Sequence, residues 1–78
     1  MNVIVERTAA VAKAREAVQN HCMCARYEET PHYVIAWYPE GYFPNGCRVA
    51  LSMGKEKAMQ KLIEVMEGHW QESMWWKA

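Results

Sequence analysis

The sequence contains no aspartate, and all nine of its acidic residues are glutamate. Aspartate is the commonest carboxylate in magnesium and calcium sites and in catalytic triads, so its absence counts against both kinds of site. An excess of either charge is also missing, because nine acidic residues balance nine basic ones. This balance disfavours a strongly basic nucleic-acid binder and equally an acidic mimic of nucleic acid.

Long apolar runs are absent too. No stretch approaches the roughly 18–20 apolar residues that cross a bilayer, and Glu6 and Arg7 interrupt the N-terminal apolar stretch where a signal peptide would continue. Three cysteines, Cys22, Cys24 and Cys47, are an odd number, whereas a disulfide framework needs an even set and a secretory route. We therefore expect no membrane association, and a cytoplasmic protein with reduced thiols.

The hydrophobic share of the sequence is sufficient for a globular core. Of the 78 residues, 51% are hydrophobic and 23% are charged, which is too apolar a composition for disorder. There is no internal repeat, low-complexity tract or linker. We expect one domain that covers residues 1–78.

Apolar residues at helical spacing predict two helices. The first has Thr8 as its N-cap, fades near Asn20, and carries the stripe Val11, Ala14 and Val18. Residues 2–6 could either extend this helix or form a short strand. The second helix covers Lys55–Glu67, with Gly68 as a left-handed C-cap. Residues 69–78 then form a terminal segment that could be helical again. The expected buried stripe of the second helix is Met59, Leu62, Ile63 and Met66.

Three strands are expected between the helices, over residues 23–28, 33–38 and 47–53. The first and third alternate between apolar and polar positions, and the third should point Cys47, Val49, Leu51 and Met53 inward. The second is apolar on both faces and should be central. The pair Asn45-Gly46 is a strong turn signal between the last two strands. The predicted fold class is therefore α+β: a helix, a three-stranded antiparallel sheet and a second helix, with both helices on one sheet face.

The only conceivable metal set combines His21, Cys22, Cys24 and Cys47 with either His32 or His69. Structural zinc sites present paired cysteines at matching spacings, whereas here one pair is C-x-C and the other cysteine stands alone. Buried cysteines that act as small hydrophobes explain the pattern better, so we expect no metal and no cofactor. Glycine-rich nucleotide loops and nucleophile turns are also absent, so we expect no enzymatic activity.

The sheet face that the helices leave open carries arginines beside aromatic residues. Arg26 and Arg48 should point outward on the flanking strands, and the central strand should present either Tyr33 and Trp37 or Val34 and Tyr38. Arginines interleaved with aromatics suit base stacking on a single strand or an arginine- and tyrosine-rich protein contact. An ordinary solvated face is the alternative.

Two further aromatic groups stand out. Tyr42 and Phe43 are adjacent in the connection between the last two strands, where folding alone does not require two rings. One of them could plug the sheet while the other stays exposed as an anchor for a partner. Near the C-terminus, Trp70, Trp75 and Trp76 either cover an edge of the core or pair with another chain.

The order of elements, with Lys55-Glu56-Lys57-Ala58 at the start of the last helix, resembles the double-stranded-RNA-binding domain. That family holds phosphates of the major groove with a lysine cluster at this helix start. Gly54, Lys55 and Ala58 match its pattern, whereas Glu56 and Met59 stand where the family has further lysines. The resemblance implies an RNA-binding module.

Taken together, these features predict a non-enzymatic interaction protein, an inhibitor or regulator of the kind that phages and other mobile elements encode. We expect it to bind a larger protein or nucleoprotein complex, and it could also form a homodimer. The alternative is a module that binds RNA or single-stranded nucleic acid, although the neutral charge predicts weak direct binding. The expected partner-binding residues are Tyr42, Phe43, Arg48, Arg26, Trp37, Trp75 and Trp76.

Overall fold

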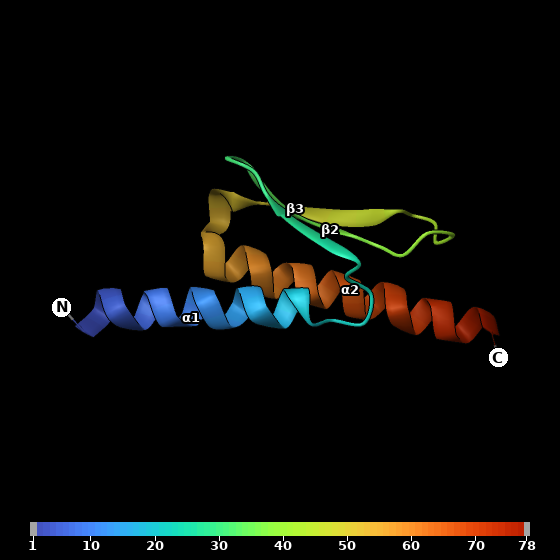
Figure 1. The fold of residues 1–78 in the computed structure, drawn as a ribbon, viewed down its shortest axis with the longest axis horizontal. Helices are drawn as coiled ribbons and strands as arrows, with labels where there is room; N and C mark the ends of the chain where they lie inside the picture. The colour runs from blue at the N-terminus through green and yellow to red at the C-terminus, as the bar shows by residue number, and fades with distance from the viewer. Residues whose placement is uncertain (1, 78) are drawn as a thin grey trace.

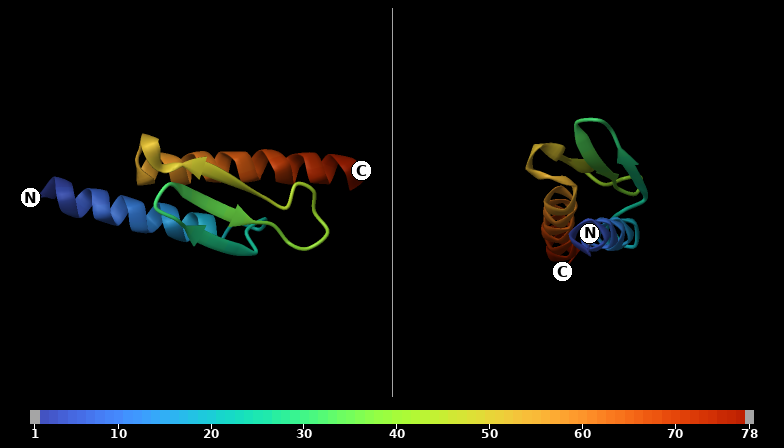
Figure 2. Two further views of the ribbon diagram at one scale, coloured as in Figure 1. Left: turned by 90° about the horizontal axis from the view of Figure 1, so that it is seen from above. Right: turned by 90° about the vertical axis from the view of Figure 1, so that its left-hand side faces the viewer.

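The computed structural model describes the backbone of residues 2–77 and the side chains of residues 9–72. Its elements, in chain order, are α1 (Asn2–Gln19), β1 (Arg26–Glu29), β2 (Tyr33–Trp37), β3 (Gly46–Ala50), the short 3₁₀ helix η1 (Leu51–Met53) and α2 (Lys55–Lys77). Helices α1 and α2 lie side by side and run in the same direction (Figure 1), and both cover one face of the sheet (Figure 2). The predicted α+β class and its layer order are confirmed.

Helix α1 starts at Asn2, which is the alternative in which residues 2–6 extend the helix. Residues 2–6 are helical, so the expectation that Thr8 caps the helix is wrong, while the end near Asn20 is confirmed. The segment before Thr8 contains no glycine or proline, so nothing in it stops a helix. The expected stripe is also present: Val18 is fully buried, and Val11 and Ala14 pack against the core.

The sheet has the order β1-β2-β3, and both pairs are antiparallel. Strand β1 begins at Arg26 rather than at Met23, because the chain after α1 first forms a turn in which the Cys24 N–H donates to the His21 carbonyl. The Ala25 N–H donates to the Trp37 carbonyl, although Arg26 is the residue paired with Trp37. Ala25, just before β1, and Arg26, its first residue, thus both face Trp37 of β2, which is the arrangement of a bulge.

Strand β3 is shifted toward the N-terminus of the predicted segment. The turn in the connection lies at Glu40–Gly41, so Gly46 opens the strand instead of closing a turn. At its other end the strand gives way to η1, where Gly54 adopts a φ of 96° and donates its N–H to Leu51. The expectation that Met53 points inward is therefore wrong, since its side chain is 45% exposed.

Helix α2 continues without interruption through Gly68. That residue does not have a positive φ, so the predicted C-cap is wrong and the expected terminal segment belongs to the same helix. A single glycine inside a helix costs only about 1 kcal/mol, and Met66 and Trp70 pack against the core on either side of it. Tertiary packing therefore outweighs the local stop signal.

The core lies between α2 and the inner face of the sheet. Three of the five largest fully buried side chains are Met59, Leu62 and Met66, all from the stripe predicted on α2. They meet Val34 of β2 and Val18 of α1, and the small residues Ala36 and Ala58 are also fully buried. With α1 and α2 on this side, the opposite sheet face is left to solvent.

Candidate functional site: the open face of the sheet

The open face is the surface formed by Arg26, Glu28, Tyr33, Ile35, Trp37 and Arg48, which point away from the helices. The sequence left two arrangements of the central strand open, and the structure selects one of them. Val34 and Ala36 are fully buried and Tyr38 is 7% exposed, so Tyr33 and Trp37 are the aromatic residues of this face. Both expected arginines are exposed on the flanking strands.

Each arginine of the open face stacks on an aromatic ring. The guanidinium carbon of Arg26 lies 5.2 Å from the Trp37 ring centroid, and that of Arg48 lies 4.8 Å from the Tyr33 ring centroid. The register explains both contacts: Arg26 pairs directly with Trp37, whereas Arg48 pairs with Ile35 and reaches Tyr33 diagonally. Cation–π attraction holds the two charged groups over the sheet and leaves Ile35 between them.

An open groove of about 400 Å³ runs beside this face. Ile35, Trp37, Phe43, Pro44, Gly46 and Arg48 contribute to its walls. Gly46 pairs with Trp37, and a Cβ atom at this position would clash with the Ala36 carbonyl oxygen and lie 3.1 Å from the Trp37 Cα. Glycine is therefore required by the close approach of β3 to β2, and the missing side chain leaves room next to the indole.

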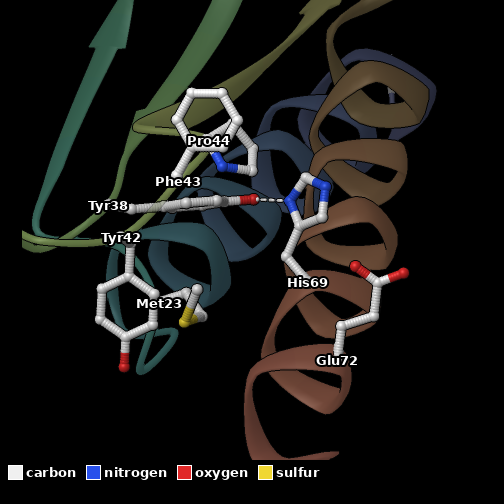
Figure 3. A pocket seen from close by; sticks show the side chains of 7 residues that line it. All are labelled: Met23, Tyr38, Tyr42, Phe43, Pro44, His69 and Glu72. Atoms are coloured by element: carbon white, nitrogen blue, oxygen red, sulfur yellow. Dashed lines mark hydrogen bonds between the residues drawn. The ribbon is translucent and has the colours of Figure 1, made fainter. Parts of the chain in front are cut away.

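Tyr42 and Phe43 are divided between core and solvent. Tyr42 is partly buried and packs against the core, whereas Phe43 is 97% exposed. Their rings point in different directions from the loop (Figure 3). The structure thus matches the alternative in which one ring plugs the sheet and the other stays out. Phe43 and Pro44 line the groove, which joins the loop to the open face.

A smaller pocket of about 80 Å³ lies behind the same loop (Figure 3). Inside it the Tyr38 hydroxyl is hydrogen-bonded to Nδ1 of His69, and the two rings meet edge to face with centroids 5.4 Å apart. Burial raises the pKa of the Tyr38 phenol, and it likewise raises the pKa of the Cys24 and Cys47 thiols. A thiol with a raised pKa is a poor nucleophile.

The remaining predicted site residues fall elsewhere. The backbone of Trp75 and Trp76 is part of α2, but the two side chains are not among those that the structure describes. Among residues 9–72 no three histidine, cysteine or glutamate side chains come together as a metal site. Cys22 is exposed, and Cys24 and Cys47 are partly buried. Ile35 is the residue that sequence reasoning missed, although its spacing from Tyr33 and Trp37 places all three on one face.

The start of α2 does not present the lysine cluster of the double-stranded-RNA-binding domain. Nζ of Lys55 lies 3.9 Å from Oε1 of Glu29, and the same carboxylate accepts a hydrogen bond of 2.5 Å from Nε of Arg15. Glu56 adds a further negative charge in the first turn of the helix. Lys55 is thus engaged with an acidic residue of the protein itself.

The chain matches no protein-family model, and neither the curated proteins nor the solved structures contain a match to it. Across the described residues, no helix has the length and apolar character needed to cross a membrane. The function must therefore be argued from the open face and the loop beside it.

Proposed function

We propose that the protein is a non-enzymatic inhibitor or regulator that binds a larger protein through its open face and Phe43. The observation that carries the proposal is the pair of arginine–aromatic stacks flanking Ile35, next to a phenylalanine that is 97% exposed. Tryptophan, tyrosine and arginine are the residue types in which the binding energy of protein interfaces is concentrated.

The stacks favour binding because they order the arginines in advance. A free arginine side chain loses rotamer freedom when it is fixed at an interface, which costs roughly 0.5–1.5 kcal/mol. Arg26 and Arg48 already rest on aromatic rings in the unbound protein, so less of that freedom remains to be lost. Among the described residues Arg48 forms no ion pair, so its planar group is available for a carboxylate of a partner, whereas Arg26 also lies 3.9 Å from the carboxylate of Glu28.

Phe43 supports the proposal because exposure of its ring to water is unfavourable in the unbound protein. It is the most exposed of the large hydrophobic side chains described, and it packs against nothing that folding requires. Transfer of such a ring into an apolar pocket contributes roughly 1.5–3 kcal/mol. A small, ordered chain that covers a surface of its partner excludes other molecules from it, which is how an inhibitor of this size acts.

The second candidate function is binding of RNA or single-stranded nucleic acid. Aromatic rings on a sheet face between arginines favour it, and the order of elements is that of the double-stranded-RNA-binding domain. However, the arginines lie over the rings on which bases would stack, and Lys55 is paired with Glu29. We therefore rank it second.

The test is a comparison of three baits in lysate of the native host: the wild-type chain, Phe43→Ala and Met53→Ala. Met53 is the matched control, because it is an exposed large hydrophobic residue in η1, away from the groove. Tyr42 is left unchanged since it packs against the core. We expect Phe43→Ala to keep the melting temperature within a few degrees.

A partner identified by mass spectrometry should bind Phe43→Ala at least tenfold more weakly than wild type in calorimetry, and Met53→Ala equally well. Equal affinity for all three chains would contradict the proposal.

A further inference from the structure

The two edges of the sheet differ in how they resist pairing with another strand. Strand β1 has four residues, of which Arg26, Glu28 and Glu29 are charged, and it begins with a bulge. Its end is tied to α1 through the Arg15–Glu29 pair. Charges, bulges and shortness are the usual protections of an edge strand. Strand β3 is one residue longer and has a single charge, at Arg48.

The hydrogen bonds at both ends of β3 show which of its peptide groups are free. The Tyr38 N–H donates to the Asn45 carbonyl at 2.6 Å, and the Leu51 N–H donates to the His32 carbonyl at 2.9 Å. Bonded and non-bonded positions alternate along an antiparallel pair, so Cys47 and Val49 also bond to β2. The peptide groups of Gly46, Arg48 and Ala50 consequently point away from the sheet.

Outside the helices and strands, no hydrogen bond within residues 9–72 takes up the N–H groups of these three residues. The carbonyls of Gly46 and Arg48 are also free, whereas that of Ala50, the N-cap residue of η1, belongs to the first turn of that helix. The groove beside the open face lies along the same strand and includes Gly46 and Arg48 in its lining. A free edge with an adjacent apolar groove is the arrangement that binds an extended peptide: main-chain hydrogen bonds give affinity, and alternate side chains give specificity.

We propose that β3 accepts an extended segment of the protein partner as a fourth, antiparallel strand, with an acidic residue opposite Arg48 and an apolar residue two positions later. This inference rests on the proposed function and specifies the partner segment. The acidic side chain pairs with the guanidinium that lies over Tyr33. In an antiparallel strand the residue two positions later stands opposite Gly46, on the same face. Its side chain extends over the glycine toward Trp37, where the groove is open.

A second copy of the chain fits this edge less well. In the register that uses all three free residues, two β3 strands pair about Arg48, so the arginines of the two copies stand directly opposite each other. Like charges in that position destabilise a strand pair. The charge of the edge therefore favours an acidic segment of another protein.

The substitution Ala50→Pro tests the strand addition without removing any contact to β2. Ala50 has a φ of −66° and a ψ of 139°, which suits proline, and its N–H is one of those that point outward. Val49, the residue before it, is already extended, as the residue preceding a proline must be. Ala50→Val is the control, because it keeps the N–H and adds a side chain of similar size.

The probe is a display library of random linear peptides selected on the full chain. We expect enriched peptides to carry Asp or Glu with an apolar residue two positions later, and to slow amide hydrogen exchange at Arg48. They should bind Ala50→Pro at least tenfold more weakly than wild type, and Ala50→Val equally well.

Failure of the library to enrich such peptides, or unchanged binding by Ala50→Pro, overturns the inference. It is also overturned if the wild-type chain dimerises in sedimentation and Ala50→Pro does not, because the occupant is then a second copy. The two proposals fail separately. A protein partner that is lost with Phe43→Ala but retained by Ala50→Pro docks on the open face without adding a strand, which overturns this inference and keeps the proposed function. Equal affinity of the partner for wild type and Phe43→Ala contradicts the proposed function itself.

Discussion

The glycines at positions 46 and 68 differ in whether their surroundings leave room for a side chain. At Gly46 a Cβ atom would meet the backbone of β2, whereas at Gly68 nothing lies within 4 Å of that position. Gly68 also has an ordinary helical backbone inside α2. One glycine is therefore required by close strand packing, and the other only lowers the stability of its helix.

Replacement of these two residues by alanine should shift stability in opposite directions. Gly46→Ala forces β3 away from β2, and we expect it to lower the free energy of unfolding by roughly 1–3 kcal/mol. Gly68→Ala removes a flexible residue from a helix and should raise it by about 0.5–1 kcal/mol. Urea unfolding followed by circular dichroism measures both. If Gly46→Ala is as stable as wild type, β3 can move away from β2 at no cost, which contradicts the prediction.

At this scale the sequence predicted the chemical character of the site but not the division of its rings. Arg26 and Arg48 were expected on the open face from alternation alone, and they lie there, whereas Trp37 was one of two open alternatives for the central strand. The sequence pattern allowed either Tyr42 or Phe43 to be exposed. The outcome depends on how the loop closes against Met23, Tyr38 and His69, which come from segments distant in the sequence.

At the scale of the elements, Arg15 and Glu29 connect α1 to β1. Nε of Arg15 donates to Glu29 at 2.5 Å, and a second guanidinium nitrogen donates at 3.2 Å. The hydrogen bonds from Arg15 lower the pKa of the Glu29 carboxyl group. The carboxylate form of Glu29 is thus favoured by the folded state.

This pKa shift predicts a loss of stability in acid. A carboxyl group whose pKa is lowered on folding stabilises the protein above its unfolded pKa of about 4.3, and that contribution disappears as the pH falls through the lower, folded value. Since the pair is partly exposed, its contribution should be at most about 1 kcal/mol. Urea unfolding should show wild type losing more stability than Glu29→Gln between pH 7 and pH 3.

The matched control is Glu64→Gln, because Glu64 is largely exposed and its nearest cation, Lys61, lies 3.9 Å away on the same helix. Its stability should follow that of wild type with pH. An identical acid response of Glu29→Gln and wild type would show that the link between α1 and β1 carries no stabilising charge interaction.

The type and order of the elements were predictable because they depend on periodicity, which the sequence displays directly. The residues at which the elements begin and end were less predictable. Thr8, Met53 and Gly68 each carry a local signal for a helix start, a strand position or a helix stop, and each signal was overruled. In α2 the reason is visible: Met66 and Trp70 pack on both sides of Gly68, and their burial outweighs the cost of one glycine.

For the whole molecule, the placement of both helices on one side determines where a partner can bind. The helices supply the core from Val18 and from Met59, Leu62 and Met66, so the outer sheet face contributes none of the fully buried residues. That face retains the arginines and aromatics that folding does not consume, and Phe43 stands beside it. The molecule measures 50 × 22 × 18 Å, and its long dimension follows the helices, which extend beyond the sheet (Figure 1).

Charge at the scale of the whole molecule separates the two candidate functions. The formal net charge is zero, and Lys55, at the start of α2, lies next to Glu29. Affinity for random nucleic acid comes mainly from the release of counterions by cationic side chains that are free to contact phosphates. We therefore expect a labelled RNA duplex and a labelled single strand to bind with a Kd of ~10⁻⁴ M or weaker at about 150 mM salt, the range of non-specific binding.

Fluorescence anisotropy measures the binding of both probes, and the variants Arg48→Gln and Lys57→Gln locate any residual binding. A loss confined to Arg48→Gln places it on the open face, and a loss confined to Lys57→Gln places it at the start of α2. Submicromolar binding of either probe by the wild-type chain would replace the protein partner with a nucleic acid, because a neutral chain reaches that affinity only through a dedicated site.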